Sequence, residues 1–167
     1  MEYRALILES VIWSIIWIFF VIISVRVFPF TIEHDYPNDV RKLANIQKPT
    51  SKQKLQGIIF GIIGFVILFG LLIVFALMHF NKQNLSFLSI FRHLWIICMT
   101  WNIVDLVIVD CLMICKFSIK WFVLPKTENY IGNKNYRFHF IGFLKGCFAL
   151  TVIAILFSAI SYGIILA

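Results

Sequence analysis

The chain has 167 residues and a formal net charge of +7, and its composition is 61% hydrophobic and only 14% charged. Soluble proteins are about 45–50% apolar and about 25% charged, so this composition excludes a water-soluble domain and predicts an integral membrane protein in contact with the lipid bilayer. The basic residues lie between apolar blocks and form no nucleic-acid-binding motif, so no nucleic-acid partner is expected.

The first apolar block covers about residues 5–28. A helix needs about 20 residues to cross a hydrocarbon core about 30 Å thick, so this block is long enough to span a membrane. It is too long for a signal-peptide core and lacks a small-residue cleavage site, so we predict a retained span. Glu9, near its outer end, is expected at the membrane interface. In the connection at 29–55, the motif "YPND" (36–39) marks a turn before a short helix.

The second and fourth apolar blocks cover about residues 56–79 and 141–166, and both contain glycines spaced four apart. Such G-x-x-x-G patterns let helix backbones approach closely. We expect close packing within a four-helix bundle, with a dimer face as the alternative. The patterns are formed by Gly57 with Gly61 and by Gly142 with Gly146.

The third block, about residues 94–115, contains three polar residues, Asn102, Asp105 and Asp110. At about 100° per residue on an α-helix, Asn102 and Asp105 share a face, whereas the two aspartates lie about 140° apart. We therefore expect the two acids to face different neighbours. An acid at the bilayer centre costs about 2.5–3.5 kcal/mol, so Asp105 is expected to face protein or water rather than lipid.

Lys145 enters the fourth block at a depth similar to that of Asp110, which predicts a salt bridge between the two. Asp105 has no cation at its own depth. Two interpretations of Asp105 stay open: a neutral, hydrogen-bonded structural acid, or a protonatable site in a transport path or ligand pocket.

The loops offer a weaker candidate site. His34, Asp35 and Asp39 follow the first block, and His139 precedes the fourth. Imidazole and carboxylate groups bind transition metals, but the spacing of these residues matches no zinc or di-iron signature. A solvated turn and an interfacial histidine are the expected structure, so no metal or other cofactor is predicted.

Twelve of the fifteen Lys and Arg residues flank or fill the first and third connections. Positive residues mark the cytoplasmic side, so both long connections are expected in the cytoplasm and both termini outside. In the connection at 117–140, Trp121 is expected at headgroup depth, and His79 and His93 are expected at the opposite interface. The prediction is an all-α integral membrane protein of the cell membrane: one domain, 1–167, with four spans and short interfacial helices in two long loops.

Four stretches carry a resemblance to a known group of proteins: "HDYPNDV" (34–40), "NIVDLVIVD" (102–110), "LPKTENY" (124–130) and "FHFIGFLKG" (138–146). They resemble small four-span membrane proteins of unknown function from Gram-positive bacteria. The resemblance implies a structural class and a bacterial origin, and it implies no mechanism.

Three functions compete. A non-enzymatic transporter, channel or accessory subunit fits the intramembrane acids and the absence of nucleophile, zinc-protease and phosphate-loop motifs. An enzyme acting on a lipid-like substrate at the cytoplasmic leaflet would use Asp105, Asp110 and His139. A scaffold would bind a cytoplasmic partner through its loops. A homo-oligomer or a membrane partner subunit is compatible with each. A cavity that reaches Asp105 would favour either of the first two functions over the third.

Overall fold

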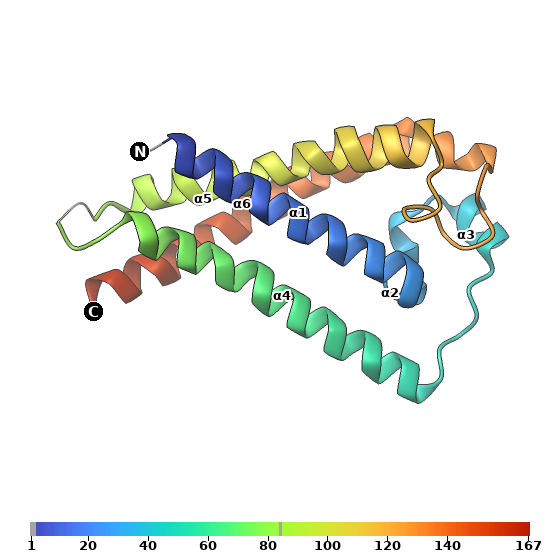
Figure 1. Cartoon of the computed structure of the whole chain (residues 1–167), viewed down its shortest axis with the longest axis horizontal. Coiled ribbons are helices and arrows are strands. Elements are labelled where there is room, and N and C mark those ends of the chain that lie inside the picture. Colours follow the sequence, from blue (N-terminus) through green and yellow to red (C-terminus); the bar gives the residue numbers. More distant parts are fainter. Residues whose placement is uncertain (1–2, 84) are drawn as a thin grey trace.

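The computed structural model describes residues 3–83 and 85–167, and the regular structure in this part of the chain is helical. Four helices of the described chain are long and apolar enough to span a membrane, and they cover the four apolar blocks of the sequence (Figure 1). They are α1 (Tyr3–Val27), α4 (Ser51–His79), α5 (Phe87–Val104) continued directly by the helix η2 (Asp105–Lys116), and α6 (Tyr136–Leu166).

Both termini lie at one end of the molecule, and the first and third connections lie at the other (Figure 1). We call these the termini end and the loop end. The first connection contains α2 (Pro29–Ile32), the 3₁₀ helix η1 (Glu33–Asp35) and α3 (Asn38–Ala44), and the third contains η3 (Ile131–Lys134). Helix α3 is the short helix that the "YPND" turn predicts.

The two long connections pack against each other at the loop end. The hydroxyl of Tyr36 donates to the carbonyl of Phe122, and the guanidinium of Arg26 donates to the carbonyl of Lys120 at 2.6 Å. Val40, Val123 and Leu124 belong to the same buried core. This packing fixes η1 over the loop end of the bundle.

Helix α4 packs against the bundle mainly at the termini end. Its buried apolar side chains, Leu68, Leu72, Phe75 and Ala76, lie in its second half, and the indole N–H of Trp13 on α1 donates to the carbonyl of Leu68 at 2.8 Å. Toward the loop end α4 diverges from the other helices (Figure 1). The first half of α4 lines a cavity there, through Gly57, Phe60, Gly61 and Phe65.

The segment η2 is a π-helix, which corrects the α-helical geometry assumed for the aspartates. The backbone N–H of Phe117 bonds to the carbonyl of Leu112, five residues earlier, at 3.0 Å. Residues five apart in a π-helix lie about one turn apart, so Asp105 and Asp110 share a face. The expectation that they face different neighbours is wrong for this reason.

The glycine pairs of α4 and α6 lie in different surroundings. A Cβ at Gly57 would lie 2.9 Å from the ring of Phe30, and a Cβ at Gly146 would collide with the side chain of Asn102. A Cβ at Gly61 or at Gly142 would have nothing within 4 Å. One glycine of each pair therefore permits a close approach, and the other faces open space.

Candidate functional site

A cavity of about 910 Å³ lies between α1, α4, η2 and α6, with η1 at its loop end. Aromatic side chains form much of its wall. The indoles of Trp17 and Trp101 stack with ring centroids 5.4 Å apart, and Phe20 and Phe60 stack at 4.9 Å. Gly61 and Gly142 also line the cavity, where their missing side chains leave it open. The volume is that of a pocket for a small organic molecule.

Seven of the eight predicted polar site residues line this cavity, from three separate parts of the chain. They are His34, Asp35, Asn102, Asp105, Asp110, His139 and Lys145. The π-helical turn brings the two intramembrane aspartates to one wall, and the packing of the loops brings Asp35 toward them. The cavity thus contains three carboxyl groups, two imidazoles and one lysine beside a wide aromatic surface.

Asp105 lies deepest of these acids, next to the junction between α5 and η2. Within residues 3–83 and 85–167, its carboxyl makes no hydrogen bond and no ion pair. Asn102, one turn earlier, donates its amide to the carbonyl of Phe143 and to Sγ of Cys147, both at 3.2 Å, so its two N–H groups are not available to Asp105. A half-buried carboxyl without a protein partner in a cavity is free to meet a ligand or a proton.

Asp110 pairs with His139, and the predicted salt bridge to Lys145 is not formed. Nδ1 of His139 lies 2.9 Å from Oδ1 of Asp110, within ion-pair distance. The prediction failed because α6 begins at Tyr136, before the apolar block, so His139 already lies on its first turn. Lys145 lies six residues further, about 9 Å deeper at about 1.5 Å per residue, at the level of Asn102.

The loop candidates do not gather into one metal-binding group. His34 lies 3.4 Å from Asp35, and both side chains are exposed at the loop end of the cavity. Desolvation raises the pKa of Asp35, His34 opposes the shift and the Asp110 carboxylate adds to it. Asp39 lies against Gly132 on η3, outside the residues that line the cavity.

Glu9, His79 and His93 are expected at the membrane interface, and the structure adds a feature that this expectation lacks, because it buries Glu9 and His93 within the protein. Glu9 is 4% exposed and His93 is 1% exposed, and the three side chains form a cluster at the termini end. The signal that would have found them is depth, because each lies near the same end of its own apolar block. Residues at one level on packed helices come together.

Comparison of the chain with protein-family models, with curated proteins and with solved structures finds no match in any of the three. The functional conclusion therefore rests on the chemistry of the cavity.

Proposed function

We propose that the protein is a non-enzymatic membrane transporter that binds amphipathic cations in its acidic cavity. The observation that carries the proposal is the unpaired carboxyl of Asp105, which faces a cavity walled by Trp17, Phe20 and Trp101. Aromatic faces attract organic cations, and a carboxylate at this depth is costly unless a positive charge or a proton neutralises it. The apolar part of an amphipathic cation would pack against the aromatic wall of the cavity, and its positive charge would pair with the Asp105 carboxyl.

The same chemistry suggests how binding and proton movement are coupled. When the cavity contains no cation, we expect Asp105 to hold a proton, because an isolated charge at this depth is unfavourable. A bound cation replaces the proton as the neutralising charge. One carboxyl that takes either a proton or a cation is the minimum element of a proton-exchange transporter.

We also propose that the loop end faces the cytoplasm and that both termini lie outside, in the cell membrane. The excess of Lys and Arg in the first and third connections supports this orientation. The cavity would then open on the cytoplasmic side, where η1 and Asp35 lie at its edge.

Tetraphenylphosphonium, a lipophilic cation, is a suitable probe for calorimetry on the protein in lipid nanodiscs. We expect it to bind the wild type, to release protons on binding, and to bind Asp105→Asn at least about 10-fold more weakly, a change of about 1.4 kcal/mol. Asp39→Asn is the matched control, because Asp39 does not line the cavity. Equal affinity in Asp105→Asn, or no binding to the wild type, would contradict the proposal. Uptake of the cation into proteoliposomes under a pH gradient then tests transport.

A second candidate is an enzyme acting on a lipid-like substrate, and the pair Asp110–His139 favours it. A carboxylate that holds one imidazole nitrogen orients the ring as a general base, and Nε2 of His139 has no partner in the described chain. The cavity hydroxyls of Ser24 and Thr31 donate to backbone carbonyls instead of to His139. An enzyme of this kind would therefore use His139 to activate water. Hydrolysis of a lipid by the wild-type protein, absent in the His139→Gln variant, would support this second function.

A further inference from the structure

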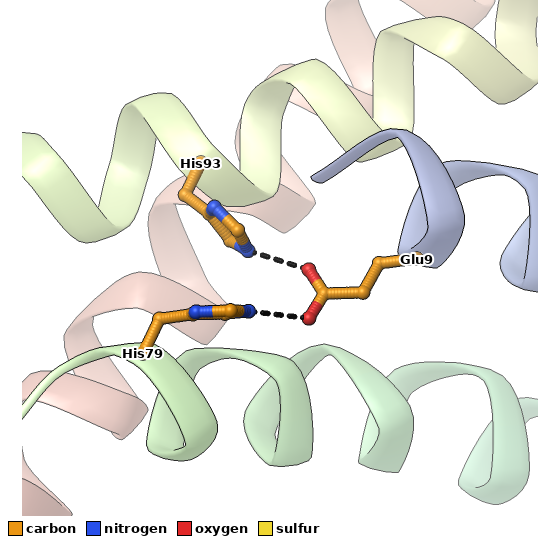
Figure 2. A group of neighbouring side chains, drawn as sticks. All are labelled: Glu9, His79 and His93. Carbon is orange, nitrogen blue, oxygen red and sulfur yellow. Dashed lines mark hydrogen bonds and ion pairs between the residues drawn. The ribbon is translucent and has the colours of Figure 1, made fainter. Parts of the chain in front are cut away.

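The cluster at the termini end joins three helices through one carboxylate. Glu9 reaches from α1 between the imidazoles of His79 on α4 and His93 on α5 (Figure 2). The Nε2–H of His79 donates to Oε1 of Glu9 at 2.7 Å, and the Nε2–H of His93 donates to Oε2 at 2.8 Å. Three donor atoms, one from each residue, lie within 4.8 Å of one another. None of these residues lines the acidic cavity.

We propose that Glu9, His79 and His93 form a binding site for one divalent transition-metal ion, with zinc as the representative ion. Two imidazoles and one carboxylate are a donor set that binds zinc with a fourth position left for water. They are also a set used for ferrous iron and other first-row ions. Ligand distances of about 2.0–2.2 Å place tetrahedral donors about 3.3 Å apart, so small side-chain movements bring these three atoms into position.

Burial and charge both favour a bound cation here. The side chain of Glu9 is 6% exposed and that of His93 is 2% exposed, whereas the 22% exposed side chain of His79 leaves a route for the ion. Buried charges in proteins are usually paired or coordinate a metal, so a dication would compensate the buried carboxylate of Glu9. No lysine or arginine of the described residues forms an ion pair with Glu9.

The surroundings of His93 set the expected strength of the site. Metal-binding histidines usually donate their second ring nitrogen to a protein group, but Nδ1 of His93 has no partner in the part of the chain that the structure describes. Loss of such a partner weakens metal binding by about 10–100-fold, so we expect a site weaker than a structural zinc site with complete outer contacts.

The position of the site suggests what the ion would do. Helix α4 is attached to the bundle at the termini end and diverges from it toward the loop end (Figure 1). An ion held by α1, α4 and α5 would fix the point from which α4 diverges. It would therefore act as a clamp on the helices and leave the cavity free.

Zinc binding to the metal-stripped protein, purified without a histidine tag, tests the proposal. By calorimetry we expect one zinc ion per chain, and we expect zinc to raise the Tm. Co²⁺ bound in place of zinc should give the visible absorption bands that are typical of four- or five-coordinate Co²⁺. His79→Gln and His93→Gln keep an N–H donor for Glu9 but remove the imidazole ligand, and each should bind zinc at least about 10-fold more weakly. His34→Gln, an exposed histidine at the loop end, is the matched control and should bind as the wild type does.

Two results would overturn the metal site. One is zinc affinity that is unchanged in both cluster variants or lost in the His34→Gln control. The other is a wild type that shows no zinc-dependent rise in Tm and no Co²⁺ bands, which would leave the cluster as a hydrogen-bonded contact between helices. The wild-type measurements decide whether the protein binds the metal even where a variant does not fold. Binding of tetraphenylphosphonium in the cavity is measured separately, so failure of the metal site and failure of the proposed function can be distinguished.

Discussion

The pair formed by Asp110 and His139 is the residue contact at the loop end whose loss we expect to be most costly. His139→Leu leaves the Asp110 carboxyl without its ion-pair partner, and removing one partner of a buried pair costs about 3–5 kcal/mol. We expect His139→Leu to lower the Tm strongly, and Asp110→Asn together with His139→Leu to recover part of the loss. Thermal melts of the two single variants and the double variant give the coupling energy.

Lys145 is the control for the double-mutant cycle of Asp110 and His139, because the sequence predicts it as the partner of Asp110 from its depth in the membrane. Lys145→Met and Asp110→Asn should have additive effects, since no ion pair joins these two described residues. Coupling between Asp110 and Lys145, with none between Asp110 and His139, would restore the original prediction and contradict the observed pair.

At the scale of the element, the π-helical geometry of η2 predicts which of its side chains support the bundle. On an α-helix Leu112 would share a face with Asp105, and Ile114 would lie on the opposite side. In η2, Ile114 is 4% exposed and lines the cavity together with Val109, five residues earlier. Ile114→Ala should therefore lower the Tm more than Leu112→Ala, because buried truncations cost about 2–5 kcal/mol. The reverse order would indicate α-helical geometry.

The glycines of α6 give a second prediction at this scale. Gly142→Leu places a side chain in the open cavity, so we expect a Tm near that of the wild type and weaker binding of tetraphenylphosphonium. Gly146→Leu drives a side chain into Asn102, so we expect clear destabilisation, of the order of 1–3 kcal/mol for overpacking. Thermal melts of the two variants are the measurement. Similar destabilisation by both would mean that Gly142 is a packing glycine as well.

The elements themselves were largely predictable, because lipid imposes the length of a span and supplies no hydrogen-bond partners for its backbone. Apolar length alone misplaces the ends: α4 begins at Ser51, five residues before its apolar block, where Thr50 and Gln53 form a capping box. The polar residues of the cavity were predictable from the sequence, whereas the contacts between them were less predictable. The π-helix changes which residues share a face, and a wheel drawn for an α-helix could not show this.

At the scale of the whole molecule, the fold separates two polar centres by the length of the bundle. The acidic cavity lies toward the loop end, where α4 diverges, and the cluster of Glu9, His79 and His93 lies at the termini end, where α4 is packed. A scaffold needs neither an open cavity nor a free acid within it. For the proposed transporter, this arrangement predicts that any movement of α4 is larger at the loop end than at the packed termini end.

The orientation of this molecule in the membrane is the last prediction. The Lys and Arg asymmetry predicts that the loop end faces the cytoplasm, and we then expect both termini outside because four spans would return the chain to its starting side. In a background in which the four native cysteines are replaced, Gln83→Cys should react with a membrane-impermeant maleimide added to intact cells. Lys48→Cys, in the first connection, should react only after the membrane is permeabilised. Labelling of Lys48→Cys in intact cells, with Gln83→Cys protected, would invert the topology and place the opening of the cavity outside the cell.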